Sequence, residues 1–152
     1  MASVLIIAHA PLASALKAVA GHVYAERGPT IEALDVPSTA TPDEVQAQAR
    51  ALMARASGPD WLVLTDVFGA TPCNAAQRLA DPAHVRVLTG VNVPMLWRAL
   101  CYADEALDAL ATRALGGAVQ GVLAVAPTRP PNQSTAALAR DPACDHLDHR
   151  HQ

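Results

Sequence analysis

The chain has 152 residues, of which 51% are hydrophobic and 3% aromatic, and its 11 basic and 14 acidic side chains give a formal net charge of −3. This length fits one domain with an aliphatic core, and a weakly acidic chain without a basic run is a poor nucleic-acid binder. Three cysteines without a C-x-x-C pair predict neither a disulfide framework nor a zinc ribbon. We expect a cytoplasmic protein, because this cysteine usage suits a reducing cytosol and no stretch resembles a signal peptide or a membrane span.

The first part of the chain predicts a strand, a helix and a second strand. Residues 3–8, SVLIIA, form an apolar run that is typical of a central buried strand, and the run ends at His9. Apolar residues then recur at helical spacing from Pro11 to Val23. Residues 30–36, TIEALDV, predict a more polar strand nearer a sheet edge. His9 is therefore expected in a turn between a strand and a helix.

A second helix is predicted to begin at Thr41, which is followed by Pro42 and, three residues on, by Glu44, as in a capping box. The stretch that organises the rest of the fold comes next, at residues 61–74, WLVLTDVFGATPCN. Its four leading apolar residues predict a strand covered on both faces and ending at Asp66. Gly69 permits a tight turn, and Thr71 followed by proline predicts a helix N-cap with amide donors pointing toward Asp66.

The later elements follow from similar signals. Residues 85–88 predict a fourth strand, and Pro94 opens a helix in which we expect Trp97 to pack in the core. A further helix is predicted from Asp104 as cap to a stop at Gly116 and Gly117. Residues 119–126, VQGVLAVA, predict a last strand that joins a sheet edge within the chain or on a neighbour. The prediction is thus one domain over residues 1–126, followed by a flexible tail over residues 127–152.

Repeated strand–helix–strand units predict an α/β fold with a doubly wound, mostly parallel sheet and helices on both faces. The economical strand order is 2-1-3-4, in which the first and third strands are neighbours. His9 and Asp66 would then emerge side by side at the carboxyl ends of these strands. Ligands bind at such a switch point in open parallel sheets.

This adjacency indicates a chemistry. A carboxylate that holds one ring nitrogen of a histidine fixes its tautomer and leaves the other nitrogen as a nucleophile. A nearby helix amino end, with the Thr71 hydroxyl, favours an anion, most simply a phosphoryl group. We therefore hypothesise a phosphohistidine at His9, formed without a metal or another cofactor.

Plainer interpretations stay open for each residue. His9 could be a hydrogen-bonded structural residue, Asp66 a turn acid and Thr71 only a helix cap. His22 and His84 have no evident companion, and structural or solvated roles are favoured for both. Cys144, with the histidines at positions 146, 149 and 151, has spacings that could bind a metal, but a disordered tail is the favoured interpretation. No phosphate-loop or dinucleotide-binding glycine motif occurs.

His9 after the first strand, TDVFGATPCN at residues 65–74 and GVNVPML at residues 90–96 together resemble the IIA component of the mannose family of the bacterial sugar phosphotransferase system. The resemblance spans residues 3–126. It implies that His9 accepts a phosphoryl group from the histidine phosphocarrier protein and passes it to a IIB component in trans. It also implies that Asp66 orients His9, and that Thr71 with the amides of Gly69 and Ala70 holds the phosphoryl group.

The same family is known for homodimers that exchange their last strand, which would explain residues 119–126. Three alternatives remain beside the carrier. One is a receiver-like domain phosphorylated on Asp66, which lacks the pair of acids that would hold magnesium after the first strand. The others are a regulatory sensor of phosphorylation state and a non-catalytic assembly module. The sequence names no sugar.

Overall fold

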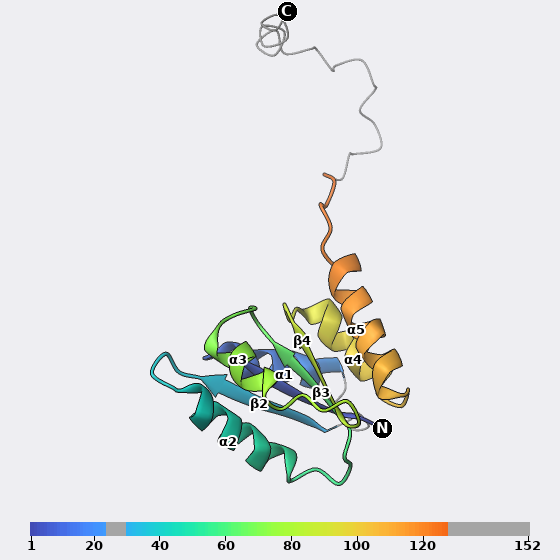
Figure 1. The fold of residues 1–152 in the computed structure, drawn as a ribbon. Helices are drawn as coiled ribbons and strands as arrows, with labels where there is room; N and C mark the ends of the chain where they lie inside the picture. Colours follow the sequence, from blue (N-terminus) through green and yellow to red (C-terminus); the bar gives the residue numbers. More distant parts are fainter. Residues whose placement is uncertain (24–29, 128–152) are drawn as a thin grey trace, which may run out of the picture.

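The computed structural model describes residues 1–23 and 30–127. In this part of the chain, four parallel strands form one sheet in the order β2-β1-β3-β4 (Figure 1). The strands are β1 (Ser3–His9), β2 (Ile31–Val36), β3 (Trp61–Thr65) and β4 (Val85–Thr89). The helices are α1 (Leu12–Val23), α2 (Pro42–Met53), α3 (Thr71–Gln77), α4 (Val93–Cys101) and α5 (Leu107–Gln120). The predicted fold class and strand order are confirmed.

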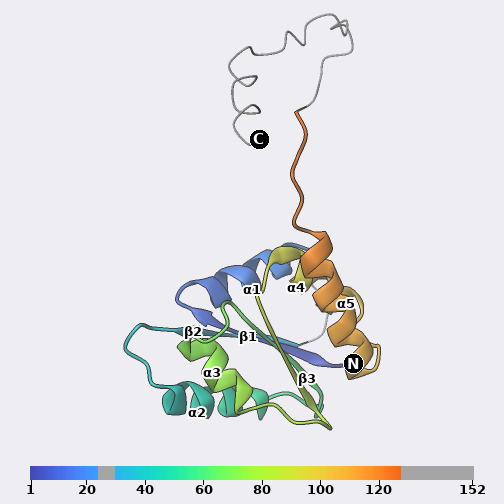
Figure 2. The ribbon, with the colours of Figure 1, turned by 45° about the horizontal axis from the view of Figure 1, so that its top comes forward.

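Helices cover both faces of the sheet, so the protein has two apolar cores (Figure 2). Because successive side chains of a strand point to opposite faces, β1 contributes Val4 and Ile6 to one core and Leu5 and Ile7 to the other. The first core is shared with α1, α4 and α5, and the second with α2 and α3. The continuous apolar runs of β1 and β3 thus reflect burial on both faces.

The pairing of β1 with β3 decides where the polar residues at the strand ends meet. Their parallel register runs from Ser3 opposite Trp61 to Ile7 opposite Thr65. His9 is the last residue of β1, and Asp66 directly follows β3. Both residues therefore leave the sheet at its carboxyl edge, as the strand order predicted.

Two predicted helix caps are wrong by one or two residues. The N-cap of α3 is Ala70 and not Thr71, because the first helical hydrogen bond runs from the Asn74 N–H to the Ala70 carbonyl. The N-cap of α5 is Ala106 and not Asp104, because the Leu110 N–H donates to the Ala106 carbonyl. The capping box at the start of α2 is confirmed, with Thr41 and Glu44 bonded reciprocally.

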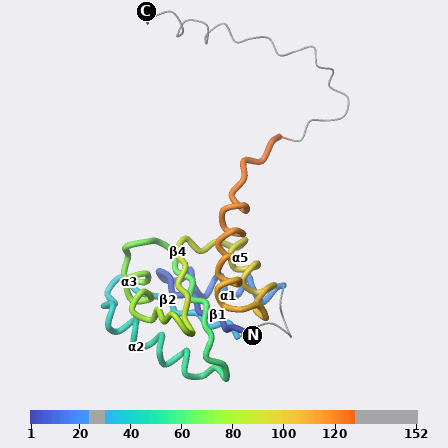
Figure 3. The backbone as a smooth tube through the Cα atoms, turned by 45° about the vertical axis from the view of Figure 1, so that its right-hand side comes forward, coloured from blue at the N-terminus to red at the C-terminus, as the bar shows by residue number. Residues whose placement is uncertain are grey.

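The predicted stop at Gly116 and Gly117 is wrong, since α5 continues to Gln120. Gly117 lies inside the helix because α4 packs closely there: a Cβ at position 117 would stand 2.3 Å from Arg98 Cγ. The beginning of the predicted last strand is therefore helical. Residues 121–127 leave the end of α5 without forming a strand in the described chain, and Leu123 and Val125 are exposed (Figures 1 and 3).

Trp97 does not pack in the core as predicted, because its side chain is 43% exposed. The inner face of α4 is already occupied by Met95, Leu96, Ala99 and Leu100, and this helical spacing turns position 97 outward.

Among the helices of residues 1–23 and 30–127, none combines the length and apolar character that crossing a bilayer requires. The predicted tail from residue 128 onward, with its possible metal ligands, lies outside the described residues.

The junction of α4 and α5 gives a stability prediction. A Cβ at Gly121 would lie 2.3 and 2.4 Å from the Pro94 ring, whereas a Cβ at Gly116 would meet nothing within 4 Å. We expect Gly121→Ala to lower the free energy of unfolding in urea by about 1–3 kcal/mol, because a proline ring yields little. Gly116→Ala is the control and should raise it by about 0.5–1 kcal/mol. A Gly121→Ala protein as stable as wild type would contradict this packing.

Candidate phosphoryl-transfer site

A histidine–aspartate pair lies at the carboxyl edge of the sheet. His9 Nδ1 is 2.6 Å from Asp66 Oδ2, and the His9 backbone N–H donates to the same oxygen at 2.9 Å. The other carboxylate oxygen, Oδ1, accepts from the Val67 N–H at 2.8 Å. Both Asp66 oxygens therefore accept hydrogen bonds, and one of them contacts both the backbone and the ring of His9.

These contacts keep the Asp66 carboxyl ionised. Burial acts to raise its pKa, but the hydrogen bonds from the His9 backbone, the His9 ring and the Val67 N–H outweigh burial, so the pKa lies below its usual range. An ionised carboxylate can only accept, so Nδ1 must carry the proton that lies between the two side chains. The neutral His9 ring consequently has its lone pair on Nε2.

The free side of the imidazole faces outward. The His9 side chain is 49% exposed, whereas that of Asp66 is 12% exposed. Nε2 makes no hydrogen bond to any of the residues that the structure describes. The pair is thus built as a buried orienting group and an accessible nitrogen with nucleophilic character.

Sequence reasoning brought out His9 and Asp66 but gave no role to Gly90. The Gly90 N–H donates to the Asp66 carbonyl at 3.0 Å, so the turn after β4 supports the backbone of the acidic residue. Gly90 has φ +83°, a conformation that favours glycine, as does Gly69 with φ +84° in the turn after Asp66. A glycine directly after a predicted strand was the signal that could have identified this support.

The residues predicted to hold a phosphoryl group lie at the start of α3. Ala70 and Thr71 are half-buried, and the Asn74 side chain donates to the Gly69 carbonyl at 3.1 Å, which fixes the turn. Within the described chain, none of Gly69, Ala70 or Thr71 is hydrogen-bonded to His9 or to Asp66. The donors to the Asp66 carboxylate are instead the His9 backbone, the His9 ring and the Val67 N–H.

Three exposed apolar residues lie close in the sequence to His9 or Asp66. Phe68 is 73% exposed, Val67 is 52% exposed and Leu12 is 39% exposed. All three lie within three residues of His9 or Asp66. We call these three residues the apolar rim; exposed apolar residues are of the kind that contact other proteins.

A second histidine–aspartate pair occurs at the opposite edge of the sheet. His84 Nδ1 lies 2.9 Å from Asp60 Oδ1, so His84 has a companion that sequence reasoning missed. Here both side chains are well exposed, at 50% and 44%, and no exposed large hydrophobic residue lies within three positions of either in the sequence. The pair is a natural control for the site at His9.

Among residues 1–23 and 30–127, no group of three or more histidine, cysteine or acidic side chains could hold a metal ion.

Comparison with known proteins places this geometry in a family. The family model EIIA-man, described as PTS system fructose IIA component, matches residues 3–115. The mannose-specific EIIAB component of the PTS system of Escherichia coli (strain K12) is 39% identical over 67 residues, which are 42% of this chain and 21% of that protein. The chain therefore matches about a fifth of the length of its curated relatives.

Solved structures show the same fold. The mannose/sorbose specific IIA subunit from Enterococcus faecalis superposes with a TM-score of 0.74 at 23% identity, over 85% of this chain and 98% of that one. Component EIIA from Streptococcus agalactiae gives a TM-score of 0.70 at 22% identity, over 82% and 97% of the two chains. With the family model matching well over half of its length, the chain belongs to the mannose family of phosphotransferase-system IIA components.

Proposed function

We propose that this protein is a cytoplasmic phosphohistidine carrier. Nε2 of His9 accepts a phosphoryl group from the histidine phosphocarrier protein and passes it to a IIB component on a separate chain, for sugar uptake or its regulation. The observation that carries the proposal is the 2.6 Å contact of Nδ1 with the Asp66 carboxylate, which leaves Nε2 as the available nucleophile. Membership of the IIA family supports the general chemistry, phosphoryl transfer in sugar uptake.

The proposed transfer needs no metal or cofactor, because each bond that forms is matched by one that breaks. The Nε2 lone pair forms a bond to phosphorus while the bond between phosphorus and the donor histidine breaks, and that electron pair stays on the donor nitrogen. The His9 ring, still protonated on Nδ1, then carries a positive charge. Asp66 stabilises this charge more than it stabilises the neutral ring, so its contact strengthens along the reaction. Transfer to the recipient is the reverse process.

The phosphoryl oxygens need donors of their own. We place these at the turn before α3, with the amides of Gly69 and Ala70 and the hydroxyl of Thr71. The positive φ of Gly69 turns the chain sharply after Asp66, and the Thr71 hydroxyl has no hydrogen bond within the described residues. The partner proteins then dock on the apolar rim, where burial of Phe68 would contribute about 2 kcal/mol.

We further propose that residues 1–126 act as a domain whose residues 121–126 add to a second copy, and that residues 127–152 form a tail outside it. β4 is an edge strand, and a groove of about 600 Å³ runs beside it, lined by Val85, Arg86 and Val87. The exposed segment with Val122, Leu123 and Val125 is a continuous apolar run of strand-forming residues, which such an edge can accept as an added strand. Exchange between two chains would bury both surfaces in a homodimer.

A regulatory sensor uses the same phosphohistidine and differs only in the recipient, whereas an assembly module would carry no label. Phosphorylation of Asp66 is disfavoured, since both of its oxygens already accept hydrogen bonds. A phosphoryl group that is labile in acid and stable in base would identify histidine over aspartate.

The first prediction concerns the acceptor. After incubation with phosphoenolpyruvate, enzyme I and the phosphocarrier protein, intact-mass analysis should find one phosphoryl group on wild type and none on His9→Ala. His84→Ala is the matched control, because it removes the other aspartate-paired histidine, and it should be labelled like wild type. Labelled His9→Ala protein would refute His9 as the acceptor.

The second prediction concerns Asp66. Asp66→Asn keeps the side-chain shape but removes the charge that balances the phosphorylated ring, so we expect single-turnover transfer to slow about 100-fold. Binding of the phosphocarrier protein, measured by titration, should be unchanged. Asp60→Asn makes the same change beside His84 and should transfer at the wild-type rate. Equal rates for the two variants would remove Asp66 from the mechanism.

The third prediction concerns the dimer. Sedimentation of the full chain should give the mass of two 15.8 kDa chains. A chain shortened to end at Gln120 loses the exchanged segment and should sediment as a monomer. A chain that ends at Pro127 retains the segment and should remain a dimer. A monomeric full chain, or a dimer that survives removal of residues 121–152, would exclude the proposed exchange.

A further inference from the structure

Two neighbouring cavities open on the outer side of α4 and α5, and neither is lined by a residue of the His9 site. Their volumes are about 480 and 300 Å³. They share Arg98, Gly117 and Gln120, so Arg98 stands where the two meet. Together they have the size of a site for a small organic molecule.

Arg98 is an uncommitted cation at this junction. Its side chain makes no hydrogen bond or ion pair with the residues that the structure describes. Its stem lies against the backbone of α5, because a Cβ at Gly117 would stand 2.3 Å from Arg98 Cγ and 3.0 Å from Arg98 Cβ. The contact with Gly117 therefore holds the side chain between the cavities without neutralising its charge.

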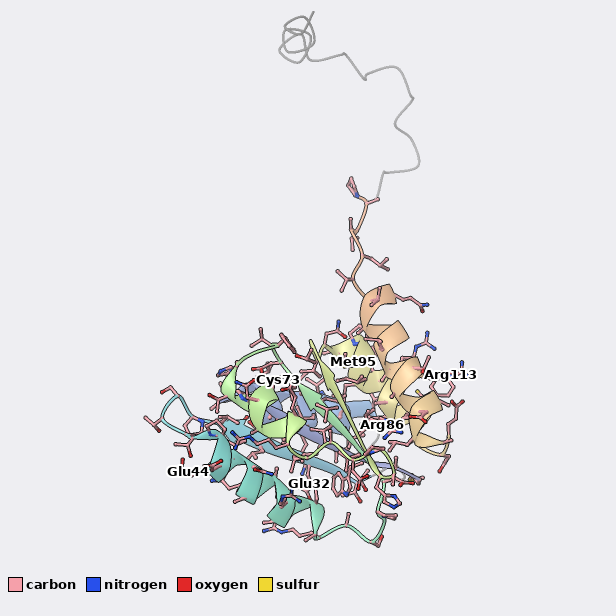
Figure 4. All side chains as sticks on the ribbon, in the orientation of Figure 1. Glu32, Glu44, Cys73, Arg86, Met95 and Arg113 are labelled. Carbon is pink, nitrogen blue, oxygen red and sulfur yellow. The ribbon has the colours of Figure 1, made fainter. Side chains whose placement is uncertain are left out.

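The other charges of the larger cavity compensate one another. Arg113, on the outer side of α5 in Figure 4, donates to both oxygens of Glu105 at 3.3 Å and lies over the Tyr102 ring at 4.7 Å. The Glu105 carboxylate is thus neutralised within the cavity wall. Arg98 leaves a net positive charge, and a guanidinium prefers phosphate or carboxylate oxygens.

Gly116 has no packing reason to be glycine. It lines the larger cavity in the middle of α5, and a Cβ there would meet nothing within 4 Å. An interior glycine costs a helix about 1 kcal/mol relative to alanine. A side chain at position 116 would reduce the volume of the larger cavity.

Neutral polar groups and an aromatic ring complete the lining. Thr112 Oγ1 donates to the Asp108 carbonyl at 2.9 Å, which leaves its oxygen free to accept from a ligand hydroxyl. Gln120 offers an amide that both donates and accepts. In the smaller cavity, the exposed Trp97 offers an apolar face.

From these groups we infer that the α4–α5 cavities form a binding site for a small phosphorylated polyhydroxy compound, of the class of a sugar phosphate. Its phosphate is bound by Arg98, and its hydroxyl groups lie against Thr112 and Gln120. The site is separate from His9 and does not depend on phosphoryl transfer there.

Calorimetric titration of the full chain with glucose 6-phosphate, inorganic phosphate and glucose tests the site. Glucose 6-phosphate should bind saturably and about tenfold or more tightly than either part alone, since both the guanidinium and the cavity are used. Arg98→Gln should weaken binding about tenfold or more. Arg55→Gln, which changes an arginine that lines neither cavity, should bind like wild type.

A second pair of variants separates loss of the cavity from loss of the fold. Gly116→Leu fills the larger cavity but favours the helix, so it should raise the melting temperature and weaken glucose 6-phosphate binding about tenfold. Gly21→Leu adds the same side chain to open space on α1 and should leave binding unchanged. Absent binding, equal affinities for all variants, or phosphate that binds as tightly as glucose 6-phosphate would overturn the proposal.

Discussion

The contact between His9 and Asp66 is the constraint on which the site depends. It exists because β1 and β3 are parallel neighbours, which brings two residues 57 positions apart to one edge of the sheet. A mostly buried carboxylate is costly unless it is hydrogen-bonded, and here three N–H groups satisfy it, two of them from His9. The same bonds that stabilise the acid fix the imidazole. Fold and chemistry therefore share one set of contacts.

Much of the fold could be predicted from the sequence, because apolar runs and capping signals are local. The run at β1 and the capping box at Thr41 are such signals. The end of α5 could not be predicted. Glycine commonly ends a helix, but in this fold Gly117 lies inside α5, where it allows close packing against α4. The prediction that Trp97 packs in the core was wrong for a related reason, because the hydrophobicity of one residue does not show which helix face meets the sheet.

The site was predictable to the level of the residue pair but not of its atoms. The strand order places His9 beside Asp66, but only the three-dimensional structure shows that Nδ1 contacts the carboxylate and that Nε2 is left for chemistry. The structure also distinguishes the two histidine–aspartate pairs. In the pair of His84 and Asp60 both side chains are exposed, whereas in the pair of His9 and Asp66 the aspartate side chain is largely buried. Burial of the acid, together with the apolar rim, is what marks one pair as the candidate site.

The central claim is that His9 is phosphorylated on the nitrogen opposite Asp66. Nuclear magnetic resonance of ¹⁵N-histidine-labelled protein, phosphorylated by the phosphocarrier relay, tests it directly through the coupling between ³¹P and the ring nitrogens. The account predicts coupling to Nε2 of His9, with the proton retained on Nδ1. A phosphoryl group on Nδ1 would contradict it, because that nitrogen could not then remain bonded to Asp66.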